Sequence, residues 1–289
     1  MTFEEIIKEI DSLPPLSTAA RLVQFMYSDG LENINISRLV KIIESDAMLT
    51  ANILKMINAP YYGFSKKIAS VAQAVSLFGI RRIHMLIVQY ALSETLEADT
   101  SIYGFNHTQF NELCHLQSAL MLQWYSRVEL RDAQFLAPLA LIMESGKLVL
   151  AKEVVASDYV GEFRKGYNEC ESIEAYETSL IGVSSYYLSA ILFEHWNLEP
   201  IYVSILKNLD KSDQEKKDID VKIQSYINEI DVIRTAINPK EILTDASIEK
   251  AAQKVQKMNH NKELFERIAY RVRDAYFKKL EKDRNWFRK

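Results

Sequence analysis

The stretch IIESDAMLTANILKMINAPYYG, residues 42–63, decides the fold class of this chain. Its apolar side chains recur at intervals of three and four residues, the spacing of one face of an α-helix: Leu49, Ile53, Met56 and Ile57. Asp46 comes just before this helix, where a carboxylate can accept the free backbone N–H groups of the first turn. Pro60 and Gly63 disfavour a continued helix, so residues 58–64 are predicted to form an irregular connection.

The rest of the chain is also predicted to be helical, which makes the fold class all-α. Glycine (8 residues) and proline (6 residues) are scarce for a 289-residue chain, and no strand-like alternation of any length occurs. One helix is expected between Pro15 and Asp29, and the others fall at 3–10, 37–44, 47–59, 71–78, 82–96, 108–126, 132–143, 147–156, 172–193, 200–208, 220–237, 246–258 and 262–283. Two polar stretches separate groups of helices: an acidic seam at 97–107 and a charged linker at 210–222.

One helix has clear signals at both ends. Ser70 followed by Gln73 is typical of a capping box that opens the segment VAQAVSLF. Gly79 follows directly and is predicted to close the helix with a positive φ, a conformation that glycine adopts without steric cost.

Composition points to a cytoplasmic protein without a membrane span. The two cysteines, Cys114 and Cys170, have no paired spacing, so neither a disulfide framework nor a zinc site is expected. The longest apolar run, Phe135–Met143, is far shorter than the roughly 20 residues that span a bilayer. The opening MTFEEIIKEI carries acidic residues before any basic region, so no signal peptide is expected.

Charge is distributed unevenly along the chain. Residues 1–206 contain 15 Lys and Arg against 24 Asp and Glu, whereas residues 207–289 contain 20 against 15. An acidic body followed by a basic C-terminal quarter suggests a separate module at the end of the chain. The alternative is a mixed-charge helix surface that happens to be rich in lysine.

Four segments taken together resemble the HDOD family, the catalytically degenerate relatives of the HD-type phosphohydrolases. They are LPPL at 13–16, the stretch at 42–63, IASVAQAVSLFGIRRI at 68–83 and ALIMESGKLVL at 140–150. The family-motif positions are Leu13, Pro14, Pro15, Glu44, Asp46, Asn58, Tyr62, Gly63, Ser70 and Gly79. The resemblance implies an HD-like multi-helix bundle over 13–208, with one part ending near residue 97 and the other starting near 107. Residues 209–289 would then be a helical C-terminal extension.

The resemblance also implies where the metal site of an active HD phosphohydrolase would lie. His115 falls at the position of the first histidine, and Met143 and Glu144 replace the adjacent His-Asp pair; these three are the vestigial positions. A thioether is a weak ligand for hard cations such as Mg²⁺ or Mn²⁺, so we expect no metal, no cofactor and no catalytic residue. A residual metal-dependent phosphohydrolase acting on nucleotides or cyclic dinucleotides is the alternative.

The basic C-terminal helices suggest a second alternative, a regulator that binds nucleic acid. Residues 261–289 hold 10 Lys and Arg against 5 Asp and Glu. The acidic body disfavours this alternative, because phosphate neutralisation supplies most non-specific affinity for nucleic acid. The same helix carries an apolar stripe, which we expect to pack on the body or on another copy of the chain: Phe265, Ile268, Ala269, Val272, Tyr276 and Leu280.

The sequence therefore predicts a non-catalytic bacterial protein of signal transduction or regulation. It would act through protein partners of a signalling pathway or through a small ligand, with a nucleotide as one candidate, on a degenerate HD scaffold. Homo-oligomers through the C-terminal helices are a further expectation, and nucleic acid is the disfavoured partner.

Overall fold

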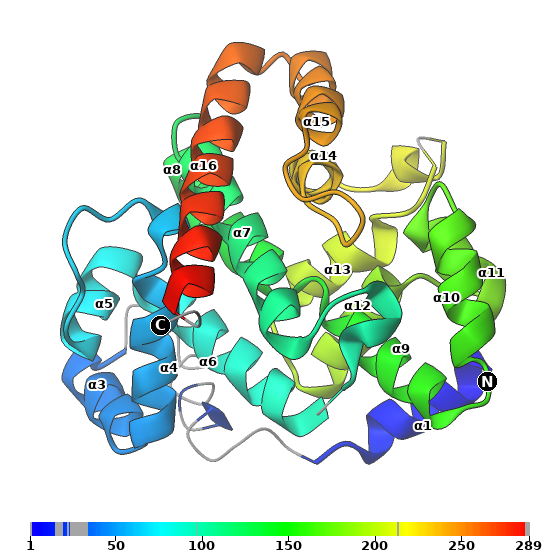
Figure 1. Ribbon diagram of the computed structural model, residues 1–289, viewed down its shortest axis with the longest axis horizontal. Coiled ribbons are helices and arrows are strands. Elements are labelled where there is room, and N and C mark those ends of the chain that lie inside the picture. Colours follow the sequence, from blue (N-terminus) through cyan, green and yellow to red (C-terminus); the bar gives the residue numbers. More distant parts are fainter. Residues whose placement is uncertain are drawn as a thin grey trace. The chain divides into compact units, whose positions relative to one another are not determined.

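The computed structural model describes residues 2–14, 20–21, 23, 34–96, 98–212 and 214–286. Throughout these ranges the regular elements are α-helices and short 3₁₀ helices, and the only β pairing is an isolated bridge between Ile237 and Ile242. Figure 1 shows the helices joined by short connections. The predicted all-α fold class is confirmed.

The described residues form two compact units, each built from separated stretches of the chain. The first unit takes its residues from Met1–Leu16, Leu92–Cys114 and Ile142–Asp231, and the second from Ser17–Ala91, His115–Leu141 and Val232–Lys289. Four helices contribute residues to both units: α6 (Ile80–Leu96), α7 (His107–Tyr125), α14 (Val221–Ala236) and, by its last residue alone, α8 (Leu130–Ile142). The predicted domain boundary near residue 208 stays a prediction.

In the first unit, α12 is the central helix. It packs against α9 and α13, and α1 packs against both α9 and α12. The elements of this unit are α1 (Phe3–Ser12), η3 (Thr100–Tyr103), α9 (Ser145–Ala156), α10 (Val160–Glu169), α11 (Ile173–Ile181), α12 (Ser185–His195), α13 (Pro200–Asn208) and η4 (Glu215–Asp218). Large side chains such as Tyr186, Phe193 and Tyr202 are fully buried here, so the unit has a core of its own.

In the second unit, α3, α4 and α5 pack against one another, and α16 packs against α15 and η2. The elements of this unit are α3 (Ile36–Glu44), α4 (Ala47–Ile57), η2 (Pro60–Tyr62), α5 (Val71–Phe78), α8 (Leu130–Ile142, all but its last residue), α15 (Asp245–Lys257) and α16 (Lys262–Trp286). The α16 ribbon is the long red helix of Figure 1.

The stretch that decides the fold class has the predicted local structure. Asp46 is the N-cap of α4, and its carboxylate accepts a hydrogen bond from the Leu49 backbone N–H at 2.9 Å. Leu49, Ile53 and Ile57 are buried, whereas Met56 is half-buried. After α4 the chain forms the short helix η2, which ends at Gly63 with φ +75°.

The capping box at Ser70 is only half formed. The Ser70 hydroxyl accepts from the Gln73 backbone N–H at 3.2 Å, as predicted. The Gln73 side chain, however, accepts from the Ala69 backbone N–H at 2.9 Å, one residue before the N-cap. Gly79 ends the helix with φ +80°, the predicted positive value.

One expectation about the middle of the chain is wrong. The single helix predicted over 172–193 is two helices, because Gly182 ends α11 with φ +84° and the Ser184 hydroxyl caps α12. The polar seam at 97–107 includes the helix η3, in which Tyr103 is fully buried. A further helix, α10, forms where none was predicted.

Some motif positions lie at or beyond the edge of the described residues. Pro15 and most of the helix predicted after it lie outside those residues. The carbonyl of Leu13 lies 3.3 Å from the His195 ring, and that of Pro14 accepts from the Trp196 indole N–H at 3.3 Å. Both contacts hold Leu13 and Pro14 against the C-terminal end of α12.

The apolar stripe of the C-terminal helix packs inside the second unit. Phe265, Ile268 and Val272 are buried, and the Phe265 ring lies edge-on to the Trp124 ring of α7 at 5.1 Å. Leu280, at the end of the stripe, is half-buried. The stripe therefore does not need another copy of the chain to cover it, and self-association stays a prediction.

One helical stretch, Leu130–Ala156, is long and apolar enough to cross a membrane. However, 89% of its apolar window is buried inside the structure. Core helices of folded proteins pass the same test of length and composition, so this stretch is weak evidence for a span.

Candidate functional site

The vestigial residue Glu144 has no exposure to solvent and is the centre of a buried charged cluster in the first unit. It stands directly before α9, and its carboxylate lies 2.8 Å from the Lys147 ammonium one turn later. The Tyr186 hydroxyl of α12 donates to the other carboxylate oxygen at 3.0 Å. Both oxygens of Glu144 are thus engaged by residues of its own unit.

Lys147 is equally buried and supplies the positive charge of the cluster. Its ammonium also donates to the Ser185 hydroxyl at 2.9 Å and lies 4.5 Å from the centre of the Tyr186 ring. Burial acts to lower the pKa of Lys147, but the carboxylates of Glu144 and Glu177 outweigh it and the net pKa is raised. The lysine is therefore charged at neutral pH.

Glu177 of α11 supplies the second buried carboxylate. It accepts a hydrogen bond from the Tyr103 hydroxyl at 2.8 Å and one from the Ser185 backbone N–H at 2.8 Å. Burial raises the pKa of Glu177, and the Lys147 charge together with the hydrogen bonds from Ser185 opposes that shift. Burial also raises the pKa of the Tyr103 hydroxyl, so Tyr103 is a firm hydrogen-bond donor.

The cluster depends on a close approach of α9 to α12. At Gly146 a Cβ atom would lie 1.9 Å from the Ser185 carbonyl oxygen, so only glycine fits between the two helices. The Ser189 hydroxyl accepts from the Gly146 backbone N–H at 2.7 Å and donates to the Met143 carbonyl at 2.7 Å. These bonds fix the start of α9 and therefore the positions of Glu144 and Lys147.

His115, the histidine among the three vestigial residues, belongs to the second unit. Its Nδ1 lies 3.0 Å from the hydroxyl of Tyr62, another motif residue, and the two rings meet edge-on. Burial lowers the pKa of His115 to about 3, with a smaller contribution from Lys279, so the imidazole is neutral. Its Nε2 is buried without a hydrogen-bond partner among the described residues, so His115 keeps one atom that could donate to a metal.

The donor set does not fit a divalent metal ion. Met143 is fully buried but offers only a thioether, and the Glu144 carboxylate is already bound to an ammonium group. Later in the chain, Asp210 accepts a hydrogen bond from the Ser184 hydroxyl, and the Asn208 amide donates to the Ser204 carbonyl at 2.7 Å. Within the described ranges, no group of three or more His, Cys, Asp and Glu residues is arranged to hold a metal ion.

Other motif residues lie at loops and helix ends. The Asn58 amide donates to the Leu54 and Ile68 carbonyls and accepts from the Ile68 backbone N–H, all within 2.8 Å, and so closes the loop that contains η2. Glu44 is the exposed last residue of α3. His84, which is not a motif residue, is buried, and this burial lowers its pKa to about 3.

Sequence reasoning missed all three charged or phenolic partners of Glu144 and Glu177: Lys147, Tyr103 and Tyr186. Lys147 was readable, because a lysine three residues after a carboxylate lies on the same face of a helix. The tyrosines come from segments far along the chain, and nothing in the local pattern marks them as partners of Glu144 or Glu177.

Several solved structures share this fold, and their descriptions range from a suggested activity to an unknown function. A "putative phosphohydrolase" of Shewanella amazonensis aligns with a TM-score of 0.68 and 14% identity, over 93% of this chain and 96% of that chain. A "putative signal transduction protein" of Marinobacter aquaeolei gives a TM-score of 0.56 and 16% identity, over 94% of this chain and 61% of that chain. An HDOD domain protein of unknown function from Geobacter sulfurreducens gives 0.60 and 14%, over 92% and 87%. These identities show the fold alone.

Among curated proteins, an uncharacterized protein of Treponema pallidum is 24% identical over 93 residues, which is 32% of this chain and 18% of that protein. The chain thus spans less than a fifth of that relative. The HDOD domain family matches residues 13–211, about two thirds of the chain, and this range takes in Glu144, His115 and the motif positions. The chain belongs to the HDOD family.

Proposed function

We propose that this protein is a non-catalytic, cytoplasmic regulator of bacterial signal transduction that acts by binding a protein partner or a small ligand. The observation that carries the proposal is the buried ion pair between Glu144 and Lys147. In this cluster an ammonium group of the chain itself neutralises the carboxylate that a metal ion would otherwise need.

The energetics favour the ion pair over a bound metal ion. To coordinate a metal, the Glu144 carboxylate would have to leave Lys147 and Tyr186, and the lysine charge would then be buried with less compensation. Removing one partner of a buried pair typically costs about 3–5 kcal/mol. With Met143 beside it as a weak ligand, little coordination energy is available to offset that cost.

The alternative is a residual phosphohydrolase, the activity suggested by the description of the Shewanella amazonensis structure. Activation of water by a metal needs several hard ligands that converge on one ion. Among the vestigial residues, His115 supplies a nitrogen, Nε2, that has no hydrogen-bond partner among the described residues, whereas both oxygens of Glu144 are engaged. The chemistry of the site therefore supports the non-catalytic proposal.

An activity assay tests the proposal directly. The protein is incubated with Mg²⁺ or Mn²⁺ and with a phosphodiester, a nucleoside triphosphate or a cyclic dinucleotide, and we expect no metal-dependent turnover. Calorimetric titration with Mn²⁺ alone should give no binding heat above that of a His115→Ala variant. Turnover that disappears in both His115→Ala and Glu144→Ala would overturn the proposal.

A further inference from the structure

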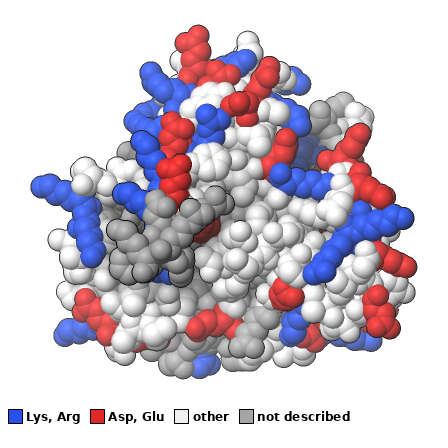
Figure 2. Space-filling model, in the orientation of Figure 1, with Lys and Arg blue, Asp and Glu red and all other residues white. Residues whose placement is uncertain are grey.

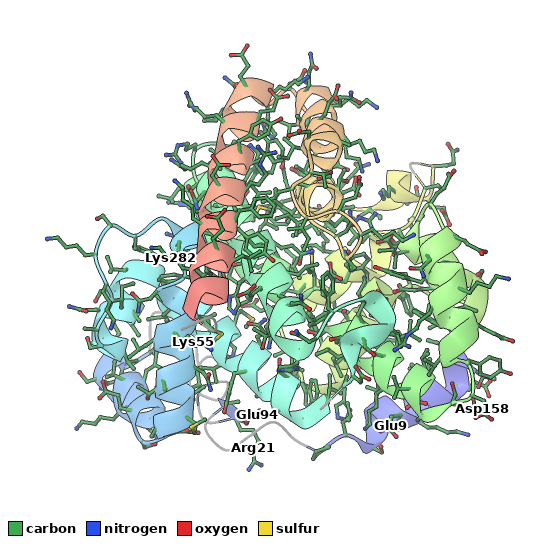
Figure 3. The ribbon with its side chains drawn as sticks, in the orientation of Figure 1. Glu9, Arg21, Lys55, Glu94, Asp158 and Lys282 are labelled. Carbon is green, nitrogen blue, oxygen red and sulfur yellow. The ribbon has the colours of Figure 1, made fainter. Side chains whose placement is uncertain are left out.

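A basic groove runs along one face of α16 in the second unit. A cavity of about 670 Å³ lies between this helix and Pro60 of η2. Its charged lining residues all come from α16: Arg267, Arg271, Asp274, Lys278, Lys279 and Lys282. Five of these six side chains are cationic, and Figure 3 labels Lys282 beside the C-terminal turns of the helix.

A second cavity, of about 350 Å³, continues the groove toward α7. Both cavities are lined by Pro60, Arg271 and Ala275, so they adjoin. Arg127, two residues after α7, lines the second cavity and adds a further cation. The groove therefore has α16 as one wall, and η2 and the end of α7 as the other.

Three of the groove cations differ from other cations of α16 in their partners. Arg273 pairs with Asp245 at 2.6 Å and Lys262 pairs with Glu266 at 3.6 Å. Lys279 lines the groove but pairs with Asp283 at 3.1 Å. Arg267, Lys278 and Lys282 are exposed and have no carboxylate partner among the described residues. Figure 2 shows basic side chains along α16 with acidic ones among them.

The walls of the groove are held together by one glutamine. The Gln123 amide of α7 accepts from the Arg271 guanidinium at 2.7 Å and donates to the Tyr61 carbonyl of η2. The Arg127 guanidinium donates to the Gln123 carbonyl at 2.8 Å. Two groove cations are thus positioned by a neutral side chain and a neutral backbone group, which leaves their charge uncompensated.

The charge of the whole second unit supports the same ligand class. Its stretches of sequence contain 25 Lys and Arg against 14 Asp and Glu, whereas those of the first unit contain 10 against 25. A net charge of −4 for the chain therefore conceals a second unit with a net charge of +11. The acidic body, which disfavoured nucleic acid in the sequence, is mostly the first unit.

We propose that the groove between α16, η2 and α7 binds a single strand of nucleic acid through its phosphates. From Arg267 to Lys282 the cations extend over fifteen residues of helix, about 22 Å at the helical rise. A linear, concave series of cations, three of which have no carboxylate partner among the described residues, matches a chain of phosphates. A single small ligand would instead need an enclosed and largely apolar pocket.

The groove reads no particular sequence. Tyr61 and Tyr62 are buried, and the Tyr270 ring is faced by the Arg273 guanidinium at 4.5 Å. Tyr61 and Tyr62 are therefore not open platforms on which bases stack. Tyr270 is half-buried and lines the first cavity, so its ring can meet one unpaired base, a contact that the paired bases of a duplex do not offer. Recognition rests on the phosphates, so affinity depends strongly on salt and weakly on base identity.

A salt titration of oligonucleotide binding tests the proposal. The full chain is titrated against a fluorescein-labelled single strand of roughly 15 nucleotides, as oligo-dT and as oligo-rU, by fluorescence anisotropy. With four or five phosphates neutralised, the logarithm of the binding constant should fall with the logarithm of salt concentration with a slope of about −3. The triple variant Arg267→Glu/Lys278→Glu/Lys282→Glu should bind at least roughly tenfold more weakly, with a slope shallower by about 2.

The matched control reverses three exposed lysines of the first unit: Lys8→Glu, Lys165→Glu and Lys211→Glu. Both triple variants change the net charge of the chain equally. If the strand binds at the groove, only the groove variant should lose affinity. The proposal fails if the strand does not bind at low salt, or if the control loses as much affinity as the groove variant. It also fails if a duplex binds as tightly as the single strand, or if poly-glutamate displaces the strand as well as unlabelled oligonucleotide does. Thermal melts of both variants exclude loss of folding as the cause.

Discussion

The two compact units of this protein carry opposite net charges, and they treat individual charges in opposite ways. In the first unit, Glu144, Lys147 and Glu177 are fully buried. Lys147 pairs with Glu144 at 2.8 Å, and Glu177 accepts hydrogen bonds from the Tyr103 hydroxyl and the Ser185 backbone N–H. In the second unit, cations such as Arg267 and Lys278 line an open groove without a carboxylate partner among the described residues.

The difference indicates which charges serve the fold and which serve an external ligand. A buried charge must be paired, because desolvation of an unpaired one costs several kcal/mol. An exposed charge has no such requirement and remains available to a molecule from outside. The vestigial HD residue Glu144 has thus become part of the core of the first unit, and the groove holds the charges that remain accessible.

The largest effect should come from breaking the buried pair with Lys147→Met. This variant keeps a long side chain but leaves the Glu144 carboxylate buried without its cation. We expect the free energy of unfolding to fall by about 3–5 kcal/mol, as measured by chemical denaturation. Adding Glu144→Gln should restore part of the loss, because the uncompensated negative charge is then removed.

The matched control is Lys152→Met in the same helix. Lys152 pairs with Glu9 of α1, a residue labelled in Figure 3, at 2.6 Å, but these side chains are 39% and 34% exposed. An exposed pair contributes about 0–1 kcal/mol, so this variant should lose no more than that. Equal losses in the two variants would show that burial does not distinguish them.

The free energy of unfolding should also fall in acid, because the second unit buries two neutral histidines, His84 and His115. Burial is the first cause that lowers the pKa of each to about 3. A histidine with a lowered folded-state pKa contributes stability that is present above its unfolded pKa of about 6.5 and is lost as the pH falls toward 3. Between pH 7 and pH 5 each histidine should cost about 2 kcal/mol.

The variant His115→Gln separates the effect of His115 from that of His84 and of the carboxylates. Glutamine does not titrate and can keep a hydrogen bond to the Tyr62 hydroxyl. Unfolding free energies are compared at pH 7 and pH 5 for the two proteins, and the variant should lose about 2 kcal/mol less than the wild type. An identical loss in both would mean that His115 is not held neutral.

The backbone of the second unit provides the third test, Gly79→Val. The φ of +80° at Gly79 is strained for any residue with a Cβ, and most of all for a β-branched one. Nothing lies within 4 Å of the added Cβ, so backbone strain alone should lower stability by about 1–3 kcal/mol. Gly161→Val is the control, because Gly161 lies in the ordinary helical region of α10 with equally open space. A melt of Gly79→Val that matches this control would exclude strain at Gly79.

The fold class was predictable because its signals are local. The caps at Asp46 and Ser70 and the positive φ of Gly79 are each set by a few neighbouring residues. Helix α10 escaped prediction because Gly161 and Gly166 obscure its pattern, and only Phe163 and Tyr167 mark a buried face. The reason for Gly166 is tertiary, since a Cβ there would lie 2.4 Å from the Tyr176 ring.

The charged site was predictable only in part, for the same reason. The resemblance to the HDOD family placed Met143 and Glu144 at the vestigial pair, and Lys147 is close enough in sequence to be paired with Glu144. Tyr103 and Glu177 join the cluster only through tertiary packing. Net charge by sequence range also misled, because each compact unit is assembled from three stretches of the chain.

The smallest effect on stability is expected at a groove cation, Lys278. Lys278 and Lys282 lie four residues apart on the same face of α16, both exposed and both cationic. Like charges at this spacing destabilise a helix by about 0.2–0.5 kcal/mol, but Asp274, four residues before Lys278, offers an attraction of similar size. Glutamine keeps the helix propensity nearly unchanged and removes both interactions. Lys278→Gln should therefore change the free energy of unfolding by less than about 0.5 kcal/mol, while it weakens binding of the single strand severalfold. Unchanged stability together with a loss of binding is the signature of a charge that serves a ligand rather than the fold. If Lys278→Gln instead destabilises the chain by more than about 1 kcal/mol, the lysine serves the fold, and the contrast between the two units fails at that residue.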